Sequence, residues 1–209
     1  MLKVEKIVVN IRYMTVNSYI LHADGENAVV IDPSAGYEQI TSRLKELGKQ
    51  CRAVLLTHGH FDHIIDTAKF RADGAKVYAH PLCAPKLKDK NLNLSRRLWL
   101  GGIAPSETDT LIKEGDILEF EGFRAQVMET PGHSADSCCF ICEGYIFTGD
   151  TLFYGDYGRT DFYDSCHADL IRSIKRLFAL PGDYIIHPGH EDSSTLDAER
   201  RHNLINNEF

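Results

Sequence analysis

The sequence predicts an α/β fold in which helices and strands are stacked in layers. Strand-like segments alternate with helical segments, and each strand-rich half of the chain ends in helices. Hydrophobic residues make up 43% of the 209 residues, which is close to the norm for globular proteins. A chain of this length suits one domain, so we expect residues 1–209 to form a single domain.

The first half of the chain predicts alternating strands and helices. The strands are short runs rich in β-branched and aromatic residues: Lys3–Val9, Ser18–His22, Ala28–Ile31, Ala53–Leu56 and Lys76–Ala79. The first helix covers Tyr37–Leu47, because apolar residues repeat along it at helical spacing and Gly48 ends it. A second helical pattern covers Ile64–Arg71.

The second half adds more strands and closes with helices. The predicted strands are Ile117–Phe120, Arg124–Glu129, Ser137–Ile141, Tyr145–Phe147 and Tyr184–His187. Helices are predicted over Ala168–Leu180 and around Thr195–Asn206, on either side of the last strand.

The stretch Pro81–Ser106 between these halves has no clear period and predicts a loop-and-helix excursion, not a domain. It contains Trp99 and is strongly basic. Two roles remain open for it: a cover over an anionic substrate, or a solvated surface. The basic residues are Lys86, Lys88, Lys90, Arg96 and Arg97.

Charge and hydropathy exclude several classes of partner. The formal net charge of −7 disfavours a nucleic-acid partner, whose binding domain is usually basic. No apolar run reaches the ~18 residues of a membrane span, so we expect no membrane partner. The N-terminus has no signal-peptide pattern, and six cysteines are too few for a disulfide scaffold. We therefore expect a cytoplasmic protein.

A histidine-rich segment, HGHFDH at residues 58–63, directly follows the strand that ends at Leu56. In an extended chain, side chains two residues apart point to the same side, so His58 and His60 can converge on one ion. Asp62 lies where the second helical pattern begins, and we expect it to cap that helix while the turn directs His63 into the same pocket. Imidazole and carboxylate suit Zn²⁺ and similar ions, so the segment predicts a metal site.

Three further turns place a ligand-type residue directly after a predicted strand. These are PGH at residues 131–133, TGDT at residues 148–151 and PGH at residues 188–190. Each motif alone is a weak signal, whereas together with HGHFDH they form one coherent set of metal ligands.

In this order and spacing, the four motifs resemble those of the metallo-β-lactamase-fold hydrolases. The resemblance runs from Asn17 to the end of the chain. It implies a four-layer αββα sandwich with two metals at one edge of the paired sheets. The implied ligands are His58, His60 and His133 for one metal, and Asp62, His63 and His190 for the other, with Asp150 bridging both.

Within this fold, the chain is most similar to the glyoxalase II-like (hydroxyacylglutathione hydrolase-like) group. It shares TGDTLF at residues 148–153, the Gly158-Arg159 turn and the segment ERRHN at residues 199–203. Only 19 residues of the sequence follow His190, so we expect no counterpart of the group's C-terminal helical domain, which contacts glutathione. Class B β-lactamases of the main type carry a cysteine at the position of Asp150, so the resemblance disfavours antibiotic hydrolysis.

The resemblance implies a dinuclear metal-dependent hydrolase whose nucleophile is a hydroxide that bridges two divalent ions. Zinc is the expected metal, although the ligands also accept iron or manganese. Asp62 is the expected catalytic residue, which orients the water or accepts its proton. A thioester suits this site because its thiolate leaves without strong acid assistance. A mononuclear iron persulfide dioxygenase or a lactonase of the same fold is the alternative.

Arg159 is the predicted substrate-binding residue. Its planar guanidinium suits a carboxylate or phosphate of an anionic small-molecule substrate. The alternative is a structural role in which Arg159 bonds a carbonyl oxygen or Asp161.

Overall fold

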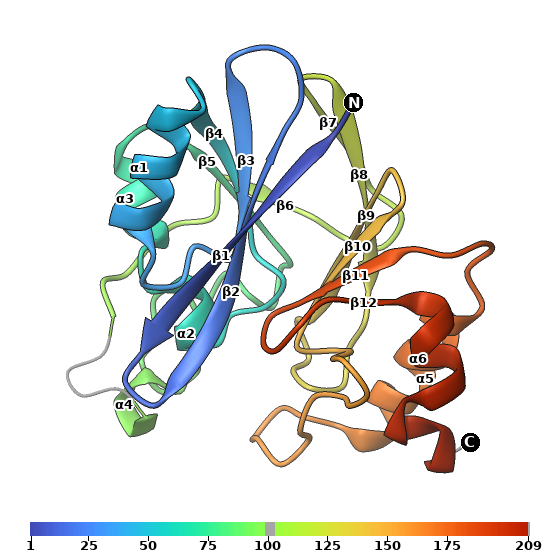
Figure 1. Cartoon of the computed structure of the whole chain (residues 1–209). Helices are drawn as coiled ribbons and strands as arrows, with labels where there is room; N and C mark the ends of the chain where they lie inside the picture. The colour runs from blue at the N-terminus through green and yellow to red at the C-terminus, as the bar shows by residue number, and fades with distance from the viewer. Residues whose placement is uncertain (99–102, 209) are drawn as a thin grey trace.

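Two six-stranded mixed sheets face each other in the computed structural model, which describes residues 1–98 and 103–208 (Figure 1). The strands of the first sheet, in spatial order, are β1 (Lys3–Ile11), β2 (Met14–His22), β3 (Asn27–Ile31), β4 (Gln50–Leu55), β5 (Lys76–Ala79) and β6 (Thr110–Leu111). Those of the second are β12 (Ser194–Thr195), β11 (Ile185–Pro188), β10 (Tyr145–Gly149), β9 (Cys138–Cys142), β8 (Phe123–Glu129) and β7 (Ile117–Phe120).

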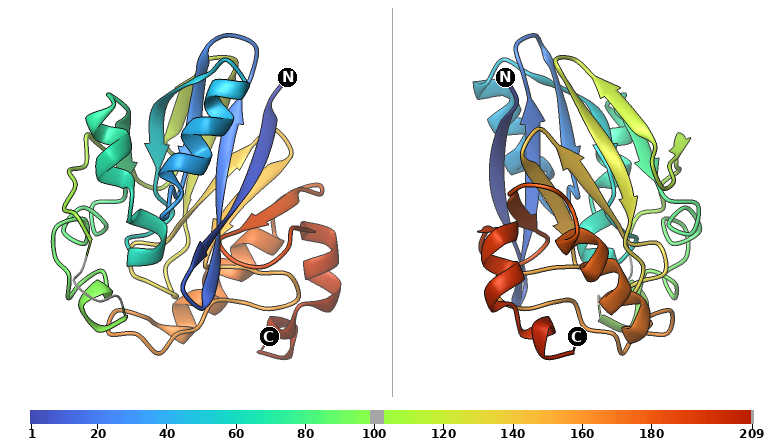
Figure 2. Two further views of the ribbon diagram at one scale, coloured as in Figure 1. Left: turned by 60° about the vertical axis from the view of Figure 1, so that its left-hand side comes forward. Right: turned by 90° about the vertical axis from the view of Figure 1, so that its right-hand side faces the viewer.

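Helices cover the outer side of each sheet. Helices α1 (Tyr37–Glu46) and α3 (Thr67–Ala72) lie on the first sheet, and α5 (His167–Phe178) and α6 (Leu196–His202) lie on the second (Figure 2). The shorter helices are α2 (Phe61–Ile64), α4 (Ser95–Leu98) and the 3₁₀-helix η1 (Leu204–Glu208). The predicted four-layer αββα sandwich is confirmed.

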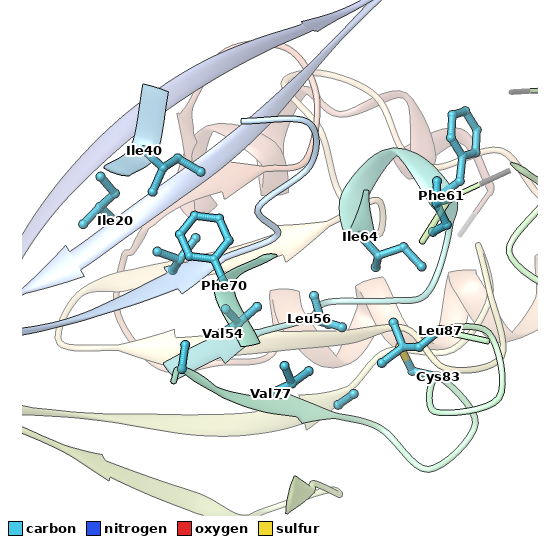
Figure 3. Close-up of a cluster of buried hydrophobic side chains, with 14 of the residues drawn as sticks. Ile20, Ile40, Val54, Leu56, Phe61, Ile64, Phe70, Val77, Cys83 and Leu87 are labelled. Carbon is cyan, nitrogen blue, oxygen red and sulfur yellow. The ribbon is translucent and has the colours of Figure 1, made fainter. Parts of the chain in front are cut away.

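Side chains along the strands point alternately to the two faces of each sheet, and this alternation produces the layers. On β2, Tyr19 and Leu21 point into the core between the sheets, whereas Ile20 points to the helices on the outer side. On β4, Val54 and Leu56 just beyond it likewise join the outer cluster, which Figure 3 shows around Phe70 and Ile40. Because successive side chains of a strand face opposite ways, each apolar strand can serve two cores at once.

The second helical pattern, predicted as one helix over Ile64–Arg71, is two helices in the structure, so that prediction is wrong. The backbone N–H of Ser34 donates to the carbonyl of His63 (2.9 Å), and the N–H of Asp66 donates to the carbonyl of Ser34 (2.7 Å). These bonds to the β3–α1 loop replace helical bonds between α2 and α3. The N-cap position of α2 is His60, so Asp62 lies inside the first turn and is not the cap.

Strand boundaries differ from the predictions mainly at short or exposed segments. The hairpin of β1 and β2 extends to Ile11 and Met14, and the two-residue strands β6 and β12 are too short to give a sequence period.

The last helix is divided: α6 is capped by the Thr195 hydroxyl, which accepts from Ala198 N (3.2 Å), and η1 follows after Asn203. No helix among residues 1–98 and 103–208 is long and apolar enough to cross a membrane.

The topology brings several strand ends to one edge of the sandwich. Strands β3 and β4 run parallel in the first sheet, and β10 and β11 run parallel in the second. Their carboxyl ends, the α2 turn and the tip of the β1–β2 hairpin all reach the lower part of Figure 1. The loops that carry the predicted ligands therefore meet there.

Candidate metal centre

All seven predicted ligands lie together at this edge, although they come from five segments. His58 and His60 lie in the loop after β4, and Asp62 and His63 lie in α2. The other three follow strands of the second sheet: His133 after β8, Asp150 after β10 and His190 after β11. Six of the seven are buried, and His190 is partly exposed.

The first trio of ligand atoms is His58 Nε2, His60 Nδ1 and His133 Nε2. His60 Nδ1 lies 3.1 Å from His58 Nε2 and 2.9 Å from His133 Nε2. Ligands about 2.0–2.1 Å from a tetrahedral zinc ion are ~3.3 Å apart, so these nitrogens are close to the spacing that one ion requires.

The second trio is formed by Asp62, His63 and His190. Asp62 Oδ2 lies 3.5 Å from His190 Nε2 and 3.8 Å from His63 Nε2. Asp150 contacts both trios. Its Oδ2 lies 3.3 Å from His190 Nε2 and 3.5 Å from His133 Nε2, and its Oδ1 lies 3.3 Å from His63 Nε2.

The outer ring nitrogens of four histidines are held by oxygen atoms, three of which come from other segments, whereas Thr57 directly precedes His58. The distances are 3.1 Å from His58 Nδ1 to Thr57 Oγ1, 2.9 Å from His63 Nδ1 to Asp32 Oδ2, 2.9 Å from His133 Nδ1 to the Arg159 carbonyl, and 2.6 Å from His190 Nδ1 to the Thr15 carbonyl. A carbonyl or carboxylate accepts a hydrogen bond from the Nδ1–H group, which leaves the lone pair on Nε2 facing the centre. This arrangement is characteristic of metal-binding histidines.

Buried polar atoms without hydrogen-bond partners show that the residues fit a metal. Among the described residues, His63 Nε2 and Asp150 Oδ1 are buried and make no hydrogen bond, although they face each other. Leaving such groups unsatisfied costs about 1–3 kcal/mol each, and more for a charged group. A cation between them would satisfy both, and His and Asp are ligands that divalent zinc and iron accept.

The electrostatics of the trios differ. Burial lowers the pKa of His58 and His133, and lowers that of His60 to about 3, so the first trio presents neutral imidazoles at neutral pH. In the second trio, burial opposes the charged forms, but Asp150 and Asp62 raise the pKa of His190 to about 10. A metal entering there replaces protons, so its binding is coupled to proton release.

Burial by itself would raise the pKa values of Asp62 and Asp150. The neighbouring imidazoles of His63 and His190 outweigh it and lower both values. Both carboxyl groups are therefore ionised at neutral pH and can serve as metal ligands.

A cavity of about 640 Å³ opens onto the two trios. Apolar and aromatic side chains from three segments form much of its wall, and Asp62, Asp150 and His190 also line it. The wall residues include Ile11, Tyr13, Met14, Leu94, Phe153, Tyr157 and Phe162. This volume falls within the range of about 300–1,000 Å³ that is typical of small-molecule sites.

Arg159 also lines the cavity, but its guanidinium is engaged. Arg159 Nε and Nη2 donate to the two carboxylate oxygens of Asp161 at 2.6 and 2.5 Å, and the guanidinium lies 4.9 Å from the ring centre of Phe162. Both members of the ion pair are exposed. Arg159 therefore makes the Asp161 contact of the structural alternative and also lines the cavity, and its substrate-binding role stays a prediction.

The prediction for the basic excursion is wrong for one residue. Lys86, predicted to cover a substrate or lie in solvent, is 3% exposed and forms ion pairs with Asp136 and Asp164. Arg96 and Arg97 are exposed, and Lys88 pairs with Glu107 at the surface. Trp99 lies outside the described residues.

Asp32 is a site residue that the sequence analysis missed. It is buried and accepts three hydrogen bonds, from Thr57 N (2.8 Å), Thr57 Oγ1 (2.6 Å) and His63 Nδ1 (2.9 Å). Its φ angle of +47° is unusual for an aspartate. In the sequence Asp32 marks only the end of a strand before Pro33. The parallel pairing of β3 with β4 brings it to the loop that carries His58 and His60.

An αββα sandwich with clustered histidine and aspartate ligands at one edge of its sheets defines a class of metal-dependent hydrolases. A family model of the metallo-beta-lactamase superfamily matches residues 12–190 of this chain. The chain belongs to the metallo-beta-lactamase superfamily.

Known proteins similar to this chain carry related descriptions. Hydroxyacylglutathione hydrolase GloC of Haemophilus influenzae is 33% identical over 192 residues, which cover 90% of this chain and 91% of GloC. The crystal structure of the B3 metallo-beta-lactamase BLEG-1 has a TM-score of 0.91 at 33% identity and covers 97% of this chain and 99% of its own. TTHA1623, solved in a di-iron-bound form, has a TM-score of 0.82 at 33% identity and covers 95% and 99%.

Replacing Asp32 by asparagine should weaken metal binding by roughly 10- to 100-fold, the usual effect of losing a group that orients a ligand. All three of its partners are donors in the structure, and an amide NH₂ would oppose one of them. Zinc titration in competition with a chromophoric chelator measures the effect. The matched control is Asp24→Asn in an exposed turn, and equal affinity of the two variants would contradict the role given to Asp32.

Proposed function

We propose that this chain is a two-metal hydrolase of small-molecule thioesters, of the glyoxalase II-like type. The position of Asp150 carries the proposal. One oxygen of its carboxylate lies 3.5 Å from His133 of the first trio and 3.3 Å from His190 of the second. A carboxylate in contact with both trios can serve as a shared ligand, so the geometry favours two ions over one.

In this proposal the two trios hold one ion each, and Asp150 is shared. The first ion is held by His58, His60 and His133, and the second by Asp62, His63 and His190. Zinc is the expected metal, and the di-iron form of TTHA1623 supports iron as the alternative. When bound, such ions supply a Lewis acid for the substrate carbonyl and lower the pKa of a coordinated water towards ~7.

Asp62 is the proposed catalytic residue. It lines the cavity beside His190, and its lowered pKa keeps the carboxylate ionised at neutral pH. An ionised carboxylate can orient an attacking water and accept its proton. We find no need for a serine or cysteine nucleophile in this arrangement.

The residues of the cavity wall favour certain parts of a substrate. Phe153, Phe162 and Leu94 can exclude water from the reacting ester and contact the apolar part of an acyl or thiol group. The described function of GloC supports a thioester. Arg159 is the group proposed to bind an anionic end of the substrate, and it does so in competition with Asp161.

Metal analysis combined with a substrate panel tests the proposed function. Purified protein should contain close to two metal ions per chain and hydrolyse thioesters such as S-lactoylglutathione or acyl-CoAs. A single iron with oxygen uptake on glutathione persulfide would instead indicate a dioxygenase. Because BLEG-1 is a B3 metallo-beta-lactamase, the panel includes a cephalosporin and a lactone, and turnover of either without thioester hydrolysis would reject the proposed substrate class.

The variant Asp62→Asn separates chemistry from folding. The amide has the same shape but cannot accept a proton, so kcat for a thioester should fall by roughly 10²-fold or more. The measurement is kcat at saturating substrate with metal content determined on the same sample. Turnover near that of the unmodified protein at full metal loading would show that Asp62 does not have this role.

Changes at Arg159 and Asp161 test recognition of an anionic substrate. Arg159→Ala should raise KM for an anionic thioester by about 10-fold or more, the loss of one hydrogen bond to a charged group. Asp161→Asn should lower that KM by up to about five-fold, since an exposed ion pair that competes with substrate is worth ~0.2–1 kcal/mol. A neutral thioester serves as the control for both variants. Equal changes in KM for the neutral and the anionic substrate would exclude Arg159 as the anion-binding group.

A further inference from the structure

A buried lysine that the metal chemistry does not use lies close to the first trio. Lys86 Nζ donates to Asp136 Oδ1 at 2.6 Å, to Asp164 Oδ2 at 2.7 Å, and to Ser134 Oγ. The lysine side chain is 4% exposed and that of Asp136 is fully buried. Its chain neighbours Cys83 and Leu87 belong to the apolar cluster around Leu56 (Figure 3), so the lysine has little freedom to leave.

The side chains of Lys86 and Asp136 hold the backbone between His58 and His60 in place. The other oxygen of Asp136, Oδ2, accepts a 2.7 Å hydrogen bond from the backbone N–H of Gly59. The stem of Lys86 packs against the same residue so closely that a Cβ on Gly59 would lie 2.7 Å from Lys86 Cβ. The position of Gly59 between two ligands means that any movement of its peptide reorients His58 and His60.

The same group also reaches the third ligand of this trio. Ser134, which follows His133 directly, donates to Asp136 Oδ1 and lies within 3.2 Å of Asp164 Oδ2. Ser165, next to Asp164, donates to the His133 carbonyl at 2.6 Å. All three histidines of the first trio are therefore adjacent to residues that Lys86, Asp136 or the Asp164 loop hold.

The second trio is held by different atoms. Asp32 bonds the outer nitrogen of His63, and the Thr15 carbonyl bonds that of His190. No hydrogen bond between described residues joins Lys86, Asp136 or Asp164 to Asp62, His63 or His190.

Both ends of the buried pair are charged. Burial opposes this state, but the carboxylates raise the pKa of Lys86, and the ammonium lowers the pKa of Asp136. Burying an ion pair is often no more stabilising than well-packed apolar residues of the same volume. Stability alone therefore gives a weak reason for a lysine here, whereas fixing the direction of the Gly59 N–H requires a fixed acceptor.

We propose that Lys86 and Asp136 are positioning residues that set the geometry of the first trio selectively. The inference rests on the proposed two-metal site. Asp136 holds the Gly59 peptide, and Lys86 holds Asp136 and packs on Gly59, so that His58 and His60 meet His133 at the spacing of one ion. The second trio keeps its geometry without them.

Zinc titration of the variant Lys86→Met tests the proposal. Affinity at the first trio should fall by roughly 10- to 100-fold while affinity at the second is retained. At a free zinc concentration that just fills both sites of the unmodified protein, the variant should therefore bind close to one ion per chain. Lys88→Met is the matched control, because Lys88 lies in the same segment but pairs with Glu107 at the surface. It should bind zinc as the unmodified protein does.

Cobalt substitution identifies which trio is lost. The visible spectrum of Lys86→Met loaded with one equivalent of Co²⁺ should match that of His133→Ala and differ from that of His190→Ala. A folded Lys86→Met protein that keeps both affinities, or that loses both equally, would overturn the proposal. The number of zinc ions on the unmodified protein tests the two-metal proposal separately, whatever the variant shows.

Asp136→Asn gives the same test if Lys86→Met does not fold. The asparagine keeps the size of the side chain and leaves Lys86 paired with Asp164, but its one oxygen cannot accept from both Gly59 and Lys86. It should show the same selective loss at the first trio. If the pair acts as one unit, Lys86→Met and Asp136→Asn combined should lose no more affinity than the larger single effect.

Discussion

Several imidazole nitrogens and carboxylate oxygens are buried at one edge of this sandwich and directed at a common space, and the rest of the structure depends on this convergence. In the first trio, contacts among the neutral imidazoles do not fix their directions, because lone pairs that face one another repel. Each must be fixed from behind. The oxygen atoms of Thr57, Asp32, Thr15 and Arg159 do this. Thr15 lies in β2 of the first sheet, and the other three lie in loops that follow strands of both sheets.

The N-terminal hairpin shows how this requirement reaches the fold. Asn17 in β2 of the first sheet donates through its backbone to the Gly189 carbonyl (2.7 Å) and through its side chain to the Pro188 carbonyl (3.0 Å). The hydroxyl of Tyr19 donates to the same Pro188 oxygen (2.7 Å). The hairpin therefore holds the loop that carries His190 in the second sheet. A register shift of β2 would release that ligand.

Sequence alone could predict what is local or periodic. Short alternating strands predicted the layers, and four motifs after strands predicted the candidate ligands that the structure places at one edge. The residues behind the ligands were not predictable in this way. Asp32 is 31 residues from His63, and Lys86 is 50 and 78 residues from Asp136 and Asp164. Lys86 lies in a stretch with several other lysines, and the composition of that stretch predicts a surface. Only the fold brings the carboxylates of Asp136 and Asp164 to this lysine.

The candidate metal ligands and the residues that contact a substrate lie in different parts of the fold. The ligands stand at the ends of strands, where sheet pairing determines their positions, and they support metal-dependent hydrolysis. The cavity wall instead comes from loops, including the hairpin tip at Met14 and the stretch from Phe153 to Phe162. Loop residues can change without disturbing the sheets, so one metal centre can serve several substrates. For this chain, we therefore propose that substrate choice depends on the Arg159–Asp161 pair and the aromatic wall, and not on the histidines.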